Sequence, residues 1–177
     1  MTDFNALPAL AEDGPSGDLV HVVIETPQHA RAKFKYDLTL RCFVLSRQLA
    51  GGLSYPYAFG FVPSTLAADG DPLDAMVISN VASFAGLVLR CRPIGVLQVE
   101  QTEKGKTVRN DRVFMVPHDA PQEEGTSEGE RLLASRKWRA ELEAFFVASI
   151  QGTGKQVKFV GWRGAATARR TIKAAIG

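Results

Sequence analysis

The chain has 177 residues, of which 45% are hydrophobic and 23% are charged, and this composition is ordinary for one globular domain that can bury a core. Its formal net charge of +2 is too small to indicate a nucleic-acid partner. Its apolar runs are shorter than the roughly 20 residues that a membrane helix needs. These totals therefore predict a globular protein with no nucleic acid and no membrane as a partner.

The first segment, residues 1–18, is acidic and has glycine, proline and serine near its end. This composition is typical of a flexible N-terminal arm. The segment lacks the basic start and apolar stretch of a signal peptide, and the two cysteines of the chain do not make a disulfide framework. We therefore expect an arm over residues 1–18, a single domain over residues 19–177 and a cytoplasmic location.

Short segments rich in β-branched and aromatic residues, bounded by glycine, proline or polar residues, dominate the chain up to about residue 117. With one more near the C-terminus, the expected strands are residues 19–26, 42–46, 75–79, 87–91, 94–100, 112–116 and 157–162. Many short strands without alternating helices predict a small β-barrel rather than a parallel α/β sheet.

Two helices are expected after the strands. Apolar residues from Trp138 to Ile150 recur at the spacing of one helix face, and residues 165–176 are rich in alanine. The acidic residues 119–131 are expected to form a long loop, although Ser127 and Glu130 have the spacing of a capping box. The predicted fold is mainly β (α+β), with a barrel and two C-terminal helices.

The stretch DGDPLDAM, residues 69–76, places three carboxylates within six positions. Asp69 and Asp71 can point the same way in an extended chain, and Pro72 lets Asp74 return towards them. Carboxylates held together repel one another unless a cation lies among them, and oxygen ligands favour Mg²⁺ or Mn²⁺. The alternative is an ordinary acidic turn, since Asp, Gly and Pro all favour turns.

Cations and a further carboxylate lie close to this stretch in the sequence. Glu25, Lys33, Arg47 and Tyr55 precede it within residues 25–74. Lys and Arg neutralise phosphoryl oxygens while a metal bridges them. The combination therefore favours a metal–phosphate substrate over a simple turn. The stretch GTGK at residues 152–155 lacks the spacing of a phosphate-binding P-loop, so we assign it no such role.

At this point the sequence resembles the soluble family I inorganic pyrophosphatases. Their signature D-x-D-P-x-D is present as DGDPLD, residues 69–74. The resemblance continues in family order over about residues 19–175, through VVIETP (22–27), RCRPIGVL (90–97), VFMVPHD (113–119) and VKFVGW (157–162). It implies a five-stranded OB-like barrel with two helices, hydrolysis of inorganic pyrophosphate to two phosphates, and a homo-oligomer, commonly a hexamer.

Carried over by position, the resemblance also implies roles for single residues. Asp69 and Asp74 would hold Mg²⁺, with Mn²⁺ as an alternative, and Glu25 would belong to the outer metal shell. Asp71 would act as general base. The position of a third metal-binding carboxylate holds Asn110, a neutral oxygen ligand. The groups that would bind phosphate or support the chemistry are Lys33, Arg47, Tyr55 and Arg112.

Several family positions hold other residues here. Lys35 replaces a glutamate, Phe59 replaces a tyrosine, and Gln101 replaces an aspartate. Ser149 and Ile150 stand where the family has Tyr-Lys. Asp111, next to Asn110, could supply the lost acid only through a register shift. These losses predict weaker metal binding and favour an impaired activity.

Three functions follow from these patterns. The first is a diphosphatase, an enzyme that hydrolyses pyrophosphate with a Mg²⁺-activated water. The second is a catalytically inactive relative that binds a phosphate compound or a partner protein. The third is hydrolysis of a related phosphoanhydride. The retained acids and cations favour the first function, and the replaced residues favour the other two.

Overall fold

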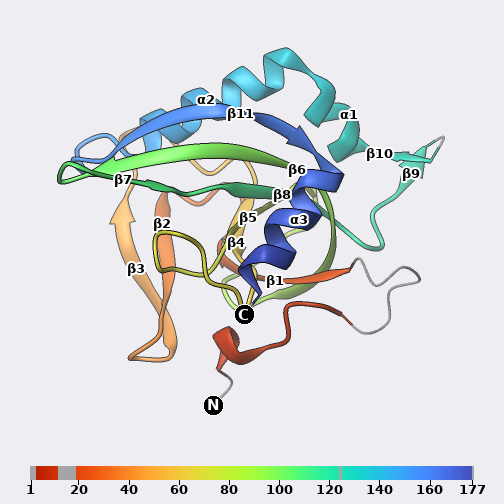
Figure 1. Cartoon of the computed structure of the whole chain (residues 1–177), viewed down its shortest axis with the longest axis horizontal. Coiled ribbons are helices and arrows are strands. Elements are labelled where there is room, and N and C mark those ends of the chain that lie inside the picture. The colour runs from red at the N-terminus through yellow and green to blue at the C-terminus, as the bar shows by residue number, and fades with distance from the viewer. Residues whose placement is uncertain (1–2, 12–18, 124, 177) are drawn as a thin grey trace.

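Five strands of the computed structural model close into a barrel (Figure 1). Around the barrel they are β1 (Val20–Thr26), β4 (Ala58–Phe61), β5 (Asp74–Val77), β8 (Arg112–Pro117) and β6 (Val88–Glu103), which pairs back with β1. Neighbours are antiparallel except β5 and β8, which are parallel. The structure describes residues 3–11, 19–123 and 125–176.

Other strands extend or flank the barrel. Both β7 (Lys106–Arg109) and β11 (Gln156–Gly164) pair with the long strand β6. A separate hairpin joins β2 (Ala32–Asp37) to β3 (Cys42–Gln48), and a short one joins β9 (Gln122–Glu123) to β10 (Thr126–Ser127).

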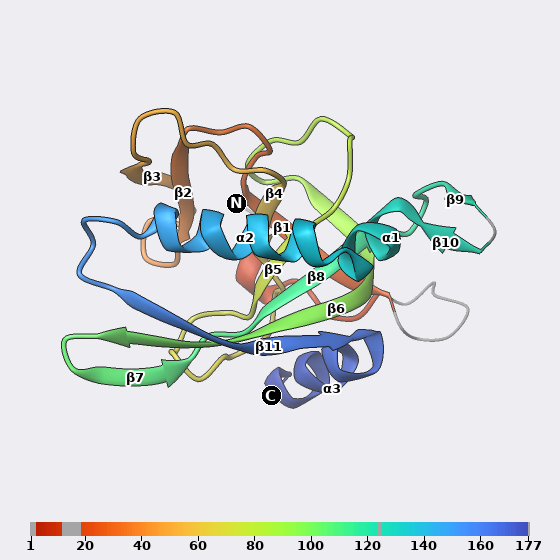
Figure 2. The same cartoon turned by 90° about the horizontal axis from the view of Figure 1, so that it is seen from above.

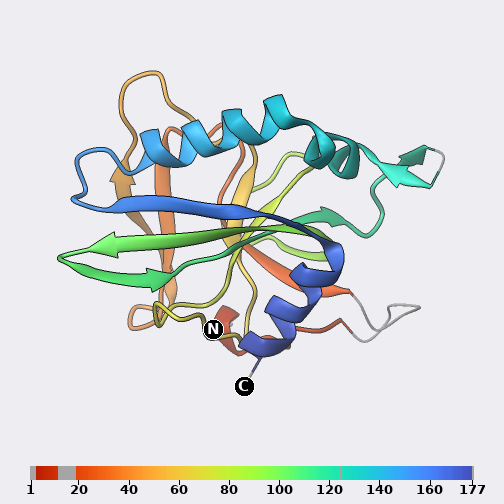
Figure 3. The ribbon, with the colours of Figure 1, turned by 45° about the horizontal axis from the view of Figure 1, so that its top comes forward.

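The helices are η1 (Phe4–Ala6), α1 (Glu128–Ala134), α2 (Arg136–Ser149) and α3 (Ala165–Ala175). Figures 2 and 3 show α2 and α3 on opposite sides of β11. No helix in the described part of the chain is long and apolar enough to cross a membrane.

The two long helices bury the apolar faces that the sequence predicts. Helix α3 packs Ala168 and Ile172 into the barrel core with Val96 and Val113. Helix α2 packs onto the sheet over Phe114, through the buried stripe Trp138, Leu142, Phe145 and Phe146. The predicted barrel with these two C-terminal helices is confirmed.

A third helix, α1, lies where a loop was expected. Both hydrogen bonds of the capping box between Ser127 and Glu130 are present, and they begin this helix. Gly129 is buried in the first turn of α1, where a Cβ atom would lie 2.5 Å from Val116 Cγ1. The glycine is therefore required where the helix approaches the barrel closely, and the expectation of a loop throughout residues 119–131 was wrong.

The strands also differ from the expected ones. Apart from residue 87, the expected strands 87–91 and 94–100 belong to the single strand β6, because Pro93 sits at a register shift that leaves the pairing with β8 intact on both sides. The strands β2, β4, β7, β9 and β10 were not predicted. In β2 the alternate residues Lys33 and Lys35 face the site described below, so the segment lacks the apolar composition by which the other strands were predicted.

The expected N-terminal arm is partly packed. The Ala11 amide donates to the Leu19 carbonyl and the His21 amide to the Ala9 carbonyl, so residues 9–11 run beside β1. The Phe4 ring lies 5.5 Å from the Tyr36 ring and 5.2 Å from the Phe43 ring. Apolar contacts therefore hold residues 3–11 against the domain, whereas residues 1–2 and 12–18 of the expected arm lie outside the described residues.

Candidate active site

Strand pairing brings together acids and cations that are far apart in the sequence. The parallel register of β5 and β8 places Asp74 beside Arg112. The antiparallel register of β2 and β3 places Lys33 opposite Arg47. The site is therefore assembled from two independent strand pairs, one from the barrel and one from the flanking hairpin.

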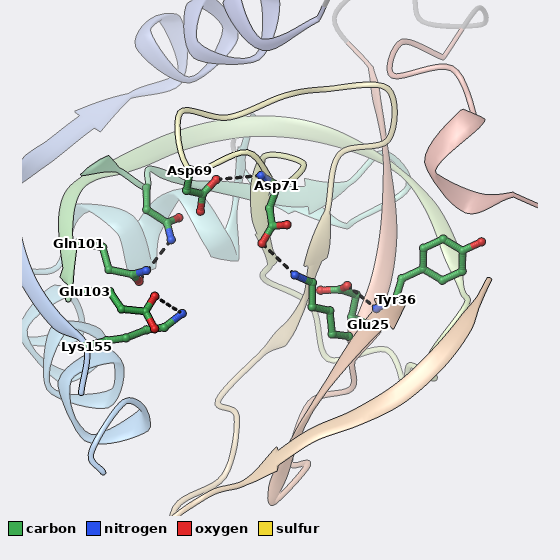
Figure 4. A network of polar contacts seen from close by, with 9 residues as sticks. Glu25, Tyr36, Asp69, Asp71, Gln101, Glu103 and Lys155 are labelled. Carbon is green, nitrogen blue, oxygen red and sulfur yellow. Dashed lines mark hydrogen bonds and ion pairs between the residues drawn. The ribbon is translucent and has the colours of Figure 1, made fainter. Parts of the chain in front are cut away.

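The acidic bend leads into the first residue of β5. The Asp71 amide donates to Asp69 Oδ1 at 3.2 Å, and Gly70 adopts φ +89°, a conformation that favours glycine. The Leu73 amide donates to Thr65 Oγ1 at 2.9 Å and anchors the far side of the bend. Figure 4 shows Asp69 and Asp71 close together, with Gln101 on one side and Glu25 on the other.

A polar cavity of about 180 Å³ lies at this bend. Its charged lining consists of five cations, Lys33, Lys35, Arg47, Arg112 and Lys155, and three carboxylates, Asp69, Asp71 and Asp74. A cavity of about 290 Å³ adjoins it, shares Lys33, Lys35, Asp71 and Asp74 with it, and adds Glu25. Every site residue predicted from the sequence lines one of these two cavities.

Burial perturbs the charged groups of the site in both directions. Desolvation raises the pKa of Glu25 to about 7, although the Tyr36 amide donates to Glu25 Oε1 at 2.7 Å and stabilises the carboxylate. Desolvation also raises the pKa of Asp74 and lowers that of Lys33, while the attraction between their opposite charges acts against both shifts. The acids and cations of this site therefore depend on one another to stay charged.

Two arginines are held from α2. The buried Arg112 guanidinium lies 4.6 Å from the centre of the Phe146 ring, and its Nη1 donates to the Asn110 carbonyl at 3.3 Å. Arg47 Nη2 donates to the main-chain carbonyl of Ser149. Within the described residues Arg112 Nε has no hydrogen-bond partner, although it is buried. A buried donor without a partner in the chain is expected to meet a ligand.

Two aromatic residues form the floor between the hairpin and α2. Tyr55 is buried against Phe59 and Phe145, with ring centres 5.8 Å and 5.1 Å apart. The Lys33 ammonium lies 5.5 Å from the centre of the Phe59 ring. Phenylalanine at position 59 thus keeps a cation–π contact with Lys33 and has no hydroxyl.

The residues that stand at replaced family positions form hydrogen bonds and ion pairs within this chain. Lys35 Nζ lies 2.9 Å from Asp71 Oδ2. Asn110 Nδ2 donates to Gln101 Oε1 at 3.4 Å, and both amides are buried. Asp111 accepts from the Val99 amide at 2.9 Å and pairs with Arg109, and it lines neither cavity. Asp111 therefore does not supply the lost acid.

Three residues of the site were given no role in it from the sequence. Lys155 lines the cavity and lies 3.6 Å from Glu103 Oε2, an ion pair drawn in Figure 4. Phe146 packs under Arg112, and Ser149 contributes its carbonyl oxygen. Lys155 could have been found from its place directly before the strand that pairs with β6. The other two act through a ring face and a main-chain atom, which leave no mark in the sequence.

The donor chemistry of the site fits a divalent cation. Aspartate oxygens and the Asn110 amide are hard ligands, which Mg²⁺ and Mn²⁺ prefer. In the described part of the chain, no three His, Cys, Asp or Glu side chains already converge on one point as a preformed metal cluster. The Lys35 ammonium lies beside Asp71 instead. The donor set therefore fits a metal ion, with Asp69 and Asp74 as the charged ligands.

A larger cavity, of about 610 Å³, lies elsewhere and differs in chemistry. Its lining is mostly apolar, with residues such as Val77, Leu87, Leu89 and Val116. Such a surface cannot neutralise a multiply charged phosphate compound. Charge, not size, therefore identifies the cavity at the acidic bend as the candidate active site.

Comparison with known proteins gives a consistent result. The family model described as inorganic pyrophosphatase matches residues 22–177. The inorganic pyrophosphatase of Gluconobacter oxydans is 37% identical over 167 residues, which are 92% of this chain and 94% of that protein. That of Synechocystis sp. is 35% identical over 161 residues, or 91% and 89% of the two chains. The crystal structure of the Thermus thermophilus enzyme superposes with a TM-score of 0.83 at 33% identity, and the match covers 99% and 97% of the two chains. With the barrel, the charged cavity and the acidic bend in place, these matches show that the chain belongs to the inorganic pyrophosphatase family.

Proposed function

We propose that this chain hydrolyses inorganic pyrophosphate to two phosphates in the cavity at the acidic bend. One observation carries the proposal: a small polar cavity gathers five cations around three carboxylates, a balance suited to a highly charged anion bound with a metal. Inorganic pyrophosphatases are metal-dependent as a family, and this chain belongs to that family. We propose Mg²⁺ as the metal, with Mn²⁺ as an alternative.

The proposed metal ligands are Asp69 and Asp74, with Asn110 as a neutral ligand and Glu25 in the outer shell. They all line the two adjoining cavities, which supports the assignment. A divalent ion, when bound, supplies Lewis acidity that makes a water molecule a better nucleophile at neutral pH.

Asp71 is the proposed general base. It accepts a proton from the attacking water, whose oxygen forms a bond to one phosphorus while the bridging P–O bond breaks. The departing phosphate carries the electron pair of that bond, and cations are needed where this negative charge develops. Lys33, Arg47 and Arg112 line the cavity and are proposed to hold the phosphate oxygens. Tyr55 is proposed to support the site from the aromatic floor.

Phosphate release from pyrophosphate with Mg²⁺ or Mn²⁺ tests the proposal. We expect Asp71→Asn to lower the rate by about 10²–10⁴-fold, which is the usual contribution of general acid–base catalysis. The matched control is Asp119→Asn, an exposed aspartate outside both cavities, which should keep the rate. Equal rates for the wild type and Asp71→Asn with both metals would reject the assignment.

One competing function is a non-catalytic chain that binds a phosphate compound or a partner protein. The Lys35–Asp71 ion pair favours it, because the carboxylate proposed as the general base is engaged with Lys35. Calorimetry with pyrophosphate, in the absence of any phosphate release, would support that function. A third possibility, hydrolysis of another phosphoanhydride, is tested with a substrate panel at fixed Mn²⁺. If pyrophosphate is the fastest substrate, the third possibility is dropped.

Two further properties remain predictions. The resemblance supports a homo-oligomer, with a hexamer as the expected form, and sedimentation velocity of the purified protein measures it. The cytoplasmic location is an expectation from the sequence.

A further inference from the structure

Lys35 lies among the acids of the site. It lies two residues after Lys33 in β2, on the same face of the strand, and both lysines line the same two cavities. Its Nζ lies 2.9 Å from Asp71 Oδ2, and the negative charges of Glu25 and Asp74 also act on it. The ammonium therefore lies beside these carboxylates and neutralises negative charge that a metal ion would otherwise neutralise.

The opposite wall of the cavity is neutral. Gln101 and Asn110 are buried there and hydrogen-bond to each other through their side-chain amides. This pair is satisfied without any ion, whereas two buried carboxylates in the same place would repel each other unless a cation separated them. The wall thus gives a second metal ion no charged ligand, and Asn110 offers only a neutral oxygen.

The charge balance agrees with these two contacts. The cavity at the acidic bend holds five cations against three carboxylates, and the adjoining cavity adds the carboxylates of Glu25 and Asp37. Each divalent ion that is added makes the site more positive, and the cations already present oppose it. A site of this charge can neutralise pyrophosphate with fewer ions than a site built mainly from acids.

We propose that the Lys35 ammonium takes the place of one divalent cation, so that the site binds its substrate with one metal ion fewer than it would with an acid at position 35. Lys35 competes with metal for Asp71, and Asp69 and Asp74 keep the remaining ion. Lys35 is thus a built-in cation that sets metal stoichiometry. The inference rests on the proposed metal–phosphate site.

Counting bound Mn²⁺ tests the inference. The probe is Mn²⁺ alone, and free Mn²⁺ is followed by electron paramagnetic resonance during titration of the full chain. We expect Lys35→Glu to bind one more tight Mn²⁺ per chain than the wild type. The control is Lys173→Glu, an exposed position on α3 outside both cavities, which should bind the wild-type number. Equal counts for the wild type and Lys35→Glu overturn the inference.

A neutral variant decides the question if Lys35→Glu does not fold. Lys35→Met frees Asp71 without adding a ligand, and we expect it to tighten Mn²⁺ binding about fivefold, since a partly exposed ion pair is worth up to about this factor. Lys155→Met removes the same charge from the same cavity without touching Asp71, and it should tighten binding less. Equal affinities for Lys35→Met and the wild type overturn the inference.

Because no pyrophosphate is present, the count does not depend on turnover. A protein that releases no phosphate but gains one ion in Lys35→Glu would reject the proposed function and support the role of Lys35. A protein that turns over pyrophosphate with unchanged counts would do the reverse.

Discussion

At the scale of single residues, burial and the neighbouring partners decide how stable each charged side chain is. In the active site, acids and cations share a small cavity, so each shift caused by desolvation is partly offset by an opposite charge. Outside the site, the same physics stabilises a helix. Glu130 accepts from the Ser127 amide at 2.8 Å and pairs with Arg92 at 2.8 Å. Its charge thus links α1 to β6.

Glu130 is expected to make stability depend on acid pH. Desolvation raises the pKa of Glu130, but the hydrogen bonds from Ser127 and the contact with Arg92 outweigh it, so the pKa lies below the ordinary value of a glutamate. A lowered folded-state pKa stabilises the protein above the unfolded-state value, and this stability is lost as the pH falls through the folded-state value. We expect Glu130→Gln to cost about 1 kcal/mol at pH 7 and progressively less below pH 4.5.

Urea unfolding at pH 7 and at several values below 4.5 measures this difference. Glu141→Gln is the control, because Glu141 is exposed and lies 4.0 Å from Lys137, a pair worth at most about 0.5 kcal/mol. A cost for Glu130→Gln that stays constant with pH would contradict the expectation.

The elements of the fold depend on close approaches between main chains, and glycine permits the closest of them. In β4, a Cβ atom at Gly60 would lie 1.9 Å from the carbonyl oxygen of Val23 in β1. The atoms nearest to this position belong to the main chain of β1, so no side chain could rotate away to relieve the contact. The pairing of β1 with β4, which closes one side of the barrel, therefore requires glycine at this position.

We expect Gly60→Ala to destabilise the protein by at least about 2 kcal/mol, because β4 must move away from β1. The matched control is Gly164→Ala, where a Cβ atom would meet nothing within 4 Å and φ is −80°. Thermal unfolding of the two variants compares them. A Gly60→Ala variant as stable as Gly164→Ala would show that the strands can separate at little cost.

On the scale of the whole molecule, the barrel separates the active site from the helix that completes its core. Helix α3 contributes Ala168 and Ile172 to the core and contributes no residue to either cavity of the site. The site residues come instead from the strands β1 to β6 and β8, from α2, and from the segments next to them. Stability and chemistry should therefore be separable by mutation.

Ile172→Ala is expected to cost about 2–5 kcal/mol of stability, because it leaves a cavity in a packed core. Phosphate release by the protein that remains folded should stay within about twofold of the wild type, because the variant changes no group of the site. Urea unfolding and the phosphate assay, both run well below the unfolding temperature, check the two parts. Val160→Ala, at an exposed position of β11, is the control for stability. A loss of activity in folded Ile172→Ala would mean that α3 positions the site.

Local patterns in the sequence were sufficient for the barrel class, for α2 and α3, and for the acidic bend with its neighbouring cations, whereas Arg112 was assigned from the family resemblance and Lys155 was missed. Strand composition, the apolar stripe from Trp138 and the acidic bend are all properties of neighbouring residues, so they can be read without a structure. Helix α1 was missed because the reason for Gly129, its approach to Val116, is a contact between distant segments. The partners of the residues at replaced family positions could not be predicted from the sequence either.

Only the tertiary structure decided that Lys35 pairs with Asp71, that Gln101 pairs with Asn110, and that Asp111 turns to Val99 and Arg109. These contacts depend on which strands pair and in what register, and long-range register follows from packing of the whole barrel rather than from any local segment. The sequence thus determined which chemical groups are present, and the fold determined which of them meet.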